Sequence, residues 1–299
     1  RNPLGRRART GGNSCVQSRL SGGGDPDSRF TVIVNTFKRP KNLRAAIRHY
    51  EKCPEVDAIR VVWSEQDQEP PIPGVDADAS MFSECVEVRY DAHPTSSLSN
   101  RFAPLADLRT QAVFNVDDDV NVLCKDLAGA HKMWRQTPEV LVGFIPRIHI
   151  KDPATEGAYL YRRWWTVFLK GSFSIILTKA CFMHRDYLEM YTTTVPQAVI
   201  QHIDKSRNCE DIAMQFVVSN VTDKPSVWVD GRYTDSGALD GISTTGIVQH
   251  RKTRDECITM FGHAFGRMPL VYGEHYVTRA GSWTSFISPP TWLEWFAFP

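Results

Sequence analysis

Residues 112–119 read Ala-Val-Phe-Asn-Val-Asp-Asp-Asp, an apolar run that ends in three adjacent carboxylates. The apolar part predicts a β-strand, and alternation along it would put Asp117 and Asp119 on one side and Asp118 on the other. Neighbouring carboxylates repel one another and resist removal from water, so a partly buried set needs cations or hydrogen-bond donors. A hard divalent ion, Mg²⁺ or Mn²⁺, completed by substrate phosphates, meets that need. The alternative is a solvated turn, but apolar residues follow the triplet and favour the metal site.

The flanking sequence predicts strands that alternate with helices. Residues 30–34 form a β-prone apolar run, a loop follows at 35–39, and a helix then carries Leu43, Ala46, Ile47 and Tyr50 on one face. We expect further strands at 59–63, 86–90, 112–116, 140–145, 174–177 and 227–229. We expect further helices after a cap at Asp126, over 179–190 and over 208–219. This order implies an α/β fold, a Rossmann-like mixed sheet flanked by helices. Ligands of such sheets bind beyond the carboxyl ends of strands, where residues 35–39 and 117–119 lie.

Length and composition indicate a soluble globular chain. Its 299 residues can form one large domain or two small ones, and 42% hydrophobic with 23% charged residues is ordinary. The net charge of +1 gives no general attraction to nucleic acid, which we do not expect as a partner. Residues 1–29 are rich in Arg, Gly and Ser and predict a flexible basic stem or an expression remnant. Since the chain begins at Arg1 rather than Met, we expect a targeting or anchor segment to have preceded it.

Cysteine usage leaves the compartment open. The seven cysteines form no CxxC pair, which argues against zinc, and we expect most of them to be small buried core residues. Because their number is odd, at least one thiol is free or pairs with another chain. The sequon Asn220-Val221-Thr222 is compatible with passage through the secretory pathway.

Several residues could accompany a metal-bound diphosphate. Candidate cations that would neutralise its remaining charge are Arg39, Arg101, His250 and Arg254, although a lone arginine is more often a surface ion-pair partner. Asp211, at an expected helix start, could orient an acceptor hydroxyl or simply complement the helix dipole. The aromatic pair Trp164-Trp165 could stack on sugars, lie at a membrane interface or pack internally. Walker-type, GxGxxG and GxSxG motifs are absent, which disfavours nucleotide hydrolases, Rossmann dehydrogenases and serine hydrolases.

Taken in order, five segments resemble the exostosin family of glycosyltransferases, and the resemblance runs from about residue 30 to about residue 272. They are Asn100-Arg101-Phe102, the residues 113–119, Val142-Gly143-Phe144-Ile145-Pro146-Arg147, the residues 207–214, and Gly266-Arg267-Met268-Pro269-Leu270. Val62-Trp63-Ser64-Glu65, Trp164-Trp165 and Gly241-Ile242-Ser243 resemble the plant-type branch, the glycosyl inositol phosphorylceramide mannosyltransferases. The heparan-forming members carry Asn where this chain has Ser64 and Ser96.

The resemblance implies a GT-A fold over residues 30–272, followed by a tail, 273–299, that has no counterpart. It also implies Mn²⁺ as cofactor and retention of anomeric configuration. Asp119 would ligate the metal, Arg254 would stabilise the leaving diphosphate, and Asp211 would face the donor sugar and the acceptor hydroxyl. Cys209 and Cys257 would form a disulfide. The sugar nucleotide would contact Thr36, Arg39, Ser64, Ser96, Arg101, Asp117, Asp118 and His250.

The function expected from this resemblance is transfer of mannose from GDP-mannose onto a glycosyl inositol phosphorylceramide. The enzyme would work in the Golgi lumen, anchored to the membrane by a segment outside this chain. One alternative is a transferase that uses a UDP-N-acetylhexosamine donor and a glycan acceptor. Another is a non-catalytic sugar-nucleotide-binding subunit that pairs with a partner glycosyltransferase chain.

Overall fold

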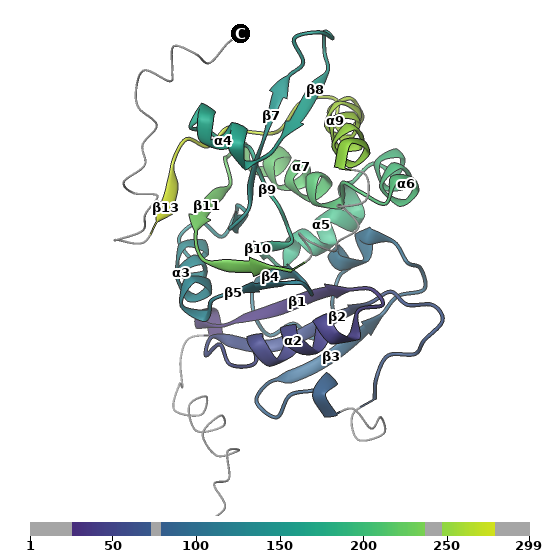
Figure 1. Ribbon diagram of the computed structural model, residues 1–299, viewed down its shortest axis with the longest axis vertical. Coiled ribbons are helices and arrows are strands. Elements are labelled where there is room, and N and C mark those ends of the chain that lie inside the picture. The colour runs from purple at the N-terminus through teal and green to yellow at the C-terminus, as the bar shows by residue number, and fades with distance from the viewer. Residues whose placement is uncertain (1–25, 73–78, 237–246, 279–299) are drawn as a thin grey trace, which may run out of the picture.

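The computed structural model describes residues 26–72, 79–236 and 247–278 (Figure 1). Their centre is an eight-stranded sheet in the order β13-β11-β6-β10-β4-β1-β2-β3. Its strands are β1 (Phe30–Thr36), β2 (Val56–Trp63), β3 (Glu87–Ala92), β4 (Ala112–Asp117), β6 (Val142–Gly143), β10 (Ala180–His184), β11 (Val227–Asp230) and β13 (Tyr276–Thr278). β10 is antiparallel to β4 and β6, and the other neighbouring pairs are parallel. The predicted Rossmann-like mixed sheet is confirmed.

Two smaller sheets and a set of helices complete the fold. β12 (Tyr233–Asp235) pairs with β5 (Val120–Val122), and β7 (Pro146–Lys151) pairs with β8 (Tyr159–Arg162) and β9 (Ile175–Ile176). The helices are α2 (Pro40–Tyr50), α3 (Cys124–Trp134), α4 (Trp164–Lys170), α5 (Asp186–Thr194), α6 (Gln197–Ser206), α7 (Glu210–Thr222) and α9 (Ile247–Ala264). Three short 3₁₀ turns are η1 (Pro26–Ser28), η2 (Ala79–Met81) and η3 (Leu98–Phe102). Figure 1 shows α5, α6, α7 and α9 grouped together on one side of the molecule.

The strongest sequence patterns form the core as predicted. The apolar residues of β4 are buried and its middle residue Asn115 is buried with them, as expected of a strand covered on both faces. The four apolar residues predicted on one face of α2 are all buried, and Pro40 begins the helix, where a missing N–H costs nothing. The ends of β1 and β4 are thereby fixed at the same edge of the sheet.

Three expectations about local structure were wrong. Residues 179–190 are not one helix, because residues 180–184 form β10, which inserts between β4 and β6, and the helix α5 starts only at Asp186. Asp126 does not cap α3, because the helix begins two residues earlier, at Cys124. The buried carboxylate of Asp126 instead accepts a hydrogen bond from the Arg232 backbone N–H at 3.1 Å. The strands expected at 140–145 and 174–177 are each reduced to two residues.

Most cysteines are buried in the core, as expected: Cys53, Cys181, Cys209 and Cys257 are fully buried. The structure adds a disulfide between Cys53 and Cys124, which joins the end of α2 to the start of α3. Cys209 and Cys257 form the disulfide that the resemblance implied, between the start of α7 and the middle of α9. Cys181 is a buried free thiol.

Among the described residues, no helix is long and apolar enough to span a bilayer. Asn220 of the sequon is exposed near the end of α7. Within the expected tail, β13 joins the central sheet beside β11, whereas Trp283, Trp292 and Trp295 lie outside the described residues. Most of the expected stem, residues 1–25, lies outside them as well.

Candidate active site

The carboxyl ends of β1, β2 and β4 bring the first group of predicted residues together. β1 lies between the two other strands and is parallel to both, with Asn35 opposite Asp117 and Thr36 opposite Trp63. Thr36, Ser64 and Asp117 therefore reach the same edge of the sheet. This is the edge at which open α/β sheets bind their ligands.

The three aspartates do not alternate as predicted. β4 ends at Asp117, so Asp118 and Asp119 lie in a turn and share a guanidinium. Arg39 Nη1 donates to Asp118 Oδ1 at 3.2 Å and to Asp119 Oδ2 at 2.7 Å, and Thr36 Oγ1 donates to Asp118 Oδ2 at 2.6 Å. Asp117 instead lies 2.8 Å from Arg101. The alternation was wrong because the strand stops before it can apply.

Burial makes this carboxylate pair costly to ionise. Desolvation raises the pKa of Asp118 to about 6, although Thr36 and Arg39 oppose the rise. Desolvation and the charge of Asp117 also raise the pKa of Asp119. Oδ1 of Asp119 is buried and, among the described residues, has no hydrogen-bond partner. An oxygen in that state fits a hard cation, so the donor set is compatible with Mg²⁺ or Mn²⁺.

The structure adds Asp235 and Lys179, which sequence reasoning missed. β12 pairs with β5, and the backbone N–H and the hydroxyl of Ser236 donate to the Asp119 carbonyl at 3.0 and 3.2 Å. Asp235 is thereby held close to Asp119, and its charge acts on the pKa of Asp119. Lys179 Nζ donates to Asp235 Oδ2 at 2.5 Å, whereas Asp235 Oδ1 is buried without a partner in the described part of the chain. Lys179 and Asp235 are 56 positions apart, and no sequence pattern indicated that they would be in contact.

Arg101 connects the aspartates to the second half of the site. Its side chain is buried, with Nη1 placed 2.8 Å from Asp117 Oδ1 and 3.5 Å from Glu210 Oε1, and Nη2 donates to the Thr178 carbonyl at 3.0 Å. We expected Arg101 to contact the nucleotide. In this structure its charge is engaged by two carboxylates, one from β4 and one from α7.

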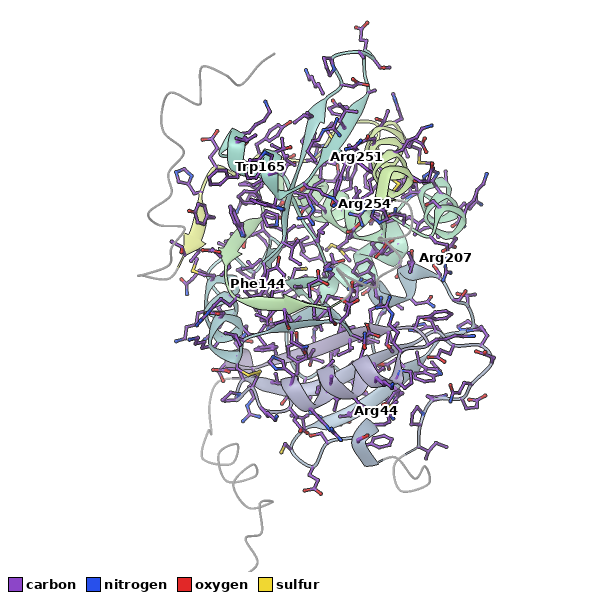
Figure 2. All side chains as sticks on the ribbon, in the orientation of Figure 1. Arg44, Phe144, Trp165, Arg207, Arg251 and Arg254 are labelled. Carbon is purple, nitrogen blue, oxygen red and sulfur yellow. A yellow bond between two sulfur atoms is a disulfide. The ribbon has the colours of Figure 1, made fainter. Side chains whose placement is uncertain are left out.

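A second ion pair lies where α7 and α9 meet. Arg254 Nη2 is 3.0 Å from Asp211 Oδ2, Nε donates to Asn208 Oδ1 at 3.1 Å, and Nη1 donates to the Tyr161 hydroxyl at 3.0 Å. Figure 2 labels Arg254 on α9. The other oxygen of Asp211 accepts the Ile212 N–H at 2.8 Å. The disulfide between Cys209 and Cys257 ties the two helices together at this point. Tyr161 and Asn208 were not predicted as site residues.

His250 lies one helical turn before Arg254 on α9. Desolvation and the neighbouring Arg254 lower the pKa of His250 to about 4. His250 is therefore neutral at pH 7 in this structure, and a neutral imidazole can donate a hydrogen bond to a diphosphate.

Ser64 and Ser96 lie along the loops at the donor edge. Ser64 Oγ accepts from Asn100 Nδ2 at 2.9 Å, and Ser96 Oγ accepts from Arg207 Nη1 at 3.2 Å. A cavity of about 270 Å³ is lined in part by Thr36, Trp63 and Glu65, the last two being the chain neighbours of Ser64.

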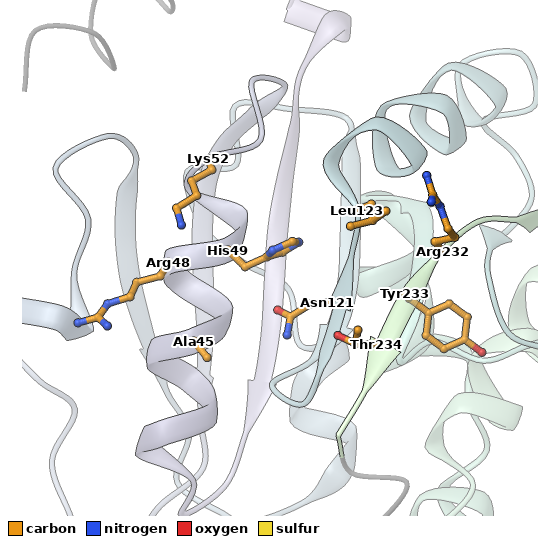
Figure 3. A pocket seen from close by; sticks show the side chains of 9 residues that line it. All are labelled: Ala45, Arg48, His49, Lys52, Asn121, Leu123, Arg232, Tyr233 and Thr234. Atoms are coloured by element: carbon orange, nitrogen blue, oxygen red, sulfur yellow. The ribbon is translucent and has the colours of Figure 1, made fainter. Parts of the chain in front are cut away.

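Another cavity, of about 480 Å³, lies between α2 and the β5–β12 pair (Figure 3). Arg48, His49, Lys52 and Arg232 give it a basic lining, and it contains none of the predicted site residues. His49, Cys53 and Cys124 lie close together nearby, but the disulfide removes both thiolates as metal ligands.

Comparison with known proteins agrees with this geometry. The model of the "Glycosyl transferase family 64 domain" matches residues 30–282. The chain belongs to this family. It is thus a glycosyltransferase that depends on a sugar nucleotide, and the prediction of an enzyme is confirmed.

Relatives of this family 64 glycosyltransferase span plants and animals. It is 38% identical over 266 residues to glycosylinositol phosphorylceramide mannosyl transferase 1 of Arabidopsis thaliana, which covers 86% of this chain and 77% of the relative. It is 34% identical over 252 residues to exostosin-2 of Mus musculus, across 82% of this chain and 33% of that protein. It is 30% identical over 264 residues to glucosamine inositolphosphorylceramide transferase 1 of Oryza sativa subsp. indica, across 87% of this chain and 34% of that protein.

Proposed function

We propose that this chain is a Mn²⁺-dependent, retaining hexosyltransferase that moves mannose from GDP-mannose onto a glycosyl inositol phosphorylceramide in the Golgi lumen. The observation that carries the proposal is the buried bridge made by Arg101, which joins Asp117 at the donor edge to Glu210 beside Asp211. The similarity to the Arabidopsis mannosyl transferase supports this donor and acceptor.

The cation would be held by Asp119, with Asp235 next to it. Both side chains offer buried oxygens that lack partners among the described residues, and hard divalent ions prefer carboxylate oxygens. When bound, the ion supplies charge that neutralises a diphosphate leaving group. Arg39 holds Asp118 and Asp119, and Lys179 holds Asp235, so both protein cations lie beside these carboxylates.

The chain's own residues would position the transfer. Arg254 is fixed by Asn208, Tyr161 and Asp211, so its charge is placed in advance to stabilise negative charge on the leaving diphosphate. Asp211 accepts two interactions that hold its carboxylate at the start of α7. There it can orient the acceptor hydroxyl and stabilise positive charge at the sugar carbon. Attack of the hydroxyl on the face from which the diphosphate departs gives retention.

The second candidate is a transferase that uses a UDP-N-acetylhexosamine. The observation in its favour is the similarity to exostosin-2 and to the rice glucosamine inositolphosphorylceramide transferase. The names of the Arabidopsis and rice relatives share inositol phosphorylceramide but differ in the sugar. The acceptor class is therefore better supported than the donor.

Incubation of the protein with Mn²⁺ and radiolabelled GDP-mannose, UDP-N-acetylglucosamine or UDP-N-acetylgalactosamine separates the candidates. The proposal expects transfer or slow hydrolysis of GDP-mannose, dependent on added Mn²⁺. Clear use of a UDP-sugar with no turnover of GDP-mannose would replace the first candidate by the second. Binding of a sugar nucleotide with no turnover of any donor or acceptor would favour the non-catalytic subunit.

A further inference from the structure

The outer surface of α4 is apolar and exposed. Trp164 and Trp165 are each 57% exposed and Leu169, one turn after Trp165, is 45% exposed. Val167, on the opposite side of the helix, is buried. We call Trp164, Trp165 and Leu169 the α4 face. Two adjacent tryptophans whose rings are more than half exposed form the kind of patch that marks an interaction surface.

Positive charge flanks the α4 face at both ends. Arg163 precedes it and Lys170 follows it; both are exposed, and within the described residues neither side chain has a hydrogen-bond or ion-pair partner. Arg162 differs, because it points back to Asp255 of α9 at 3.3 Å. The segment 161–172 contains no Asp or Glu. An apolar patch flanked along the chain by Arg163 and Lys170 is complementary to an anionic surface with an apolar interior.

The α4 face lies at the rim of the candidate active site. Tyr161, whose hydroxyl contacts Arg254, precedes Trp165 by four residues, so their Cα atoms are at most about 14 Å apart. Arg163 is also close enough to His250 for its charge to lower the pKa of that histidine. Figure 2 shows Trp165 on α4 and Arg254 on α9, with the β7–β8 pair between the two helices.

The arrangement of the rings favours a membrane interface over a sugar platform. The Trp164 and Trp165 rings lie 5.2 Å apart with their planes at 90°, so they do not present one flat surface for a pyranose. Sugar recognition also needs directional hydrogen bonds, and the exposed part of α4 offers no carboxylate or amide. Tryptophan next to arginine and lysine is typical of the boundary between headgroups and acyl chains.

We propose that the α4 face docks on the surface of a bilayer that carries anionic phospholipids, and so brings the active site to a membrane-borne acceptor. The inference rests on the proposed function, because it assumes a glycolipid acceptor with a phosphodiester in its headgroup. Trp164, Trp165 and Leu169 enter the interface, and Arg163 and Lys170 contact headgroup phosphates. The active-site rim then faces the headgroups from one side.

Sedimentation with vesicles tests the docking without donor or turnover. The wild type, Trp164→Ser/Trp165→Ser and Val221→Ser are compared on phosphatidylcholine vesicles with and without phosphatidylinositol. Val221 is an exposed apolar residue on α7 and serves as the matched control. We expect the wild type and control to bind the phosphatidylinositol vesicles, and the double variant to bind at least about tenfold more weakly, because it loses two large apolar side chains. Equal binding by the double variant, or no binding by the wild type, overturns the proposal.

The charges and the competing occupants are tested in the same way. Arg163→Gln/Lys170→Gln should weaken binding to the anionic vesicles and flatten its dependence on salt; an unchanged salt dependence contradicts the assigned role of these cations. Self-association of the wild type that the tryptophan variant abolishes, without vesicle binding, would assign the face to a second copy and overturn the proposal.

Kinetics distinguish docking from sugar recognition. With a soluble, lipid-free headgroup acceptor, the tryptophan variant should keep its kcat/KM, whereas kcat/KM for the acceptor in vesicles should fall. A higher KM for the soluble acceptor would mean that the rings bind sugar, which overturns the proposal. If no lipid acceptor is used at all, the proposed function fails, and the vesicle measurement still decides the docking by itself.

Discussion

Arg254 Nη2 lies 3.0 Å from Asp211 Oδ2, and this ion pair connects α9 to α7. Both side chains are buried, and each has further hydrogen bonds that hold it in place. A charge pair so constrained is fixed before any substrate arrives, which is the property that electrostatic stabilisation of a transition state requires.

Asp211→Asn should keep nucleotide binding and lose transfer. The amide retains the shape of the side chain but lacks the charge that orients a hydroxyl and stabilises a positive sugar carbon, so we expect kcat to fall about 10²- to 10⁴-fold. Calorimetric titration with the nucleoside diphosphate and a transfer assay measure the two effects. Glu256→Gln, at an exposed position on the same helix as Arg254, is the control. Full activity of Asp211→Asn would remove this residue from the transfer step.

Asp119→Asn should remove cation-dependent nucleotide binding, and Asp235→Asn should weaken it less. Asp119 is more deeply buried and lies in the turn after β4, whereas Asp235 shares its charge with Lys179. We expect Mn²⁺ affinity, measured by electron paramagnetic resonance, to fall at least about 100-fold for the first variant and about 10-fold for the second. Asp107→Asn, at an exposed ion pair with Arg89, is the control. Mn²⁺ binding that survives Asp119→Asn contradicts the assignment.

Removal of either disulfide should lower the stability of the protein by a similar amount, but the two removals should differ in their effect on transfer activity. The disulfides close loops of 48 and 71 residues, so removal of either should lower the unfolding free energy by about 4 kcal/mol in the chain-entropy account. Cys209→Ser/Cys257→Ser should also reduce transfer strongly, because it releases the helices that carry Asp211 and Arg254. Cys53→Ser/Cys124→Ser should reduce transfer much less. Denaturant titration and kinetic assays of both variants test this, and equal activity losses would contradict it.

Glu210 should make the protein less stable as pH rises from about 4.5 to about 7. Desolvation and the neighbouring Asp211 raise the pKa of Glu210 from 4.5 to about 7. The folded state thus binds a proton that the unfolded state has released, and ionisation at higher pH opposes folding. Glu210→Gln should remove this dependence, a difference of roughly 3 kcal/mol between the two ends of the range. Denaturant titrations at pH 4.5 and pH 8 measure it, with the exposed Glu189→Gln as control. Identical pH profiles for the variant and the wild type would contradict the shifted pKa.

Local sequence patterns correctly predicted those strands and helices whose formation depends on local sequence. The apolar runs of β1 and β4, the amphipathic spacing of α2 and the start of α7 are all present as predicted. The residues 180–184 were misread because an apolar run fits a helix and a strand equally well, and only its pairing with β4 and β6 decides between them.

Part of the candidate site could be predicted from the sequence, but four of its residues, Lys179, Asp235, Tyr161 and Asn208, and the contacts between its two halves could not. Resemblance to a family named the aspartates, Asp211, Arg254 and the disulfide partners. It did not show that Arg101 is enclosed by Asp117 and Glu210, or that Asp235 stands beside Asp119, because these contacts join segments far apart in the chain. The exposure of Trp164 and Trp165 was equally invisible, since an aromatic pair reads the same whether it is buried or not.

The guanidinium of Arg101, held between Asp117 of β4 and Glu210 of α7, has a consequence for protein engineering. In the proposed function, residues up to 119 would shape the pocket for the nucleotide and residues from 208 onward would shape the transfer step, so a chimera that exchanges one portion should inherit a new donor preference. Arg101 sets the condition for such a graft. Whichever relative supplies the later portion must bring a side chain with an accepting oxygen immediately ahead of its transfer aspartate; without it, the buried Arg101 would keep only one of its two side-chain partners.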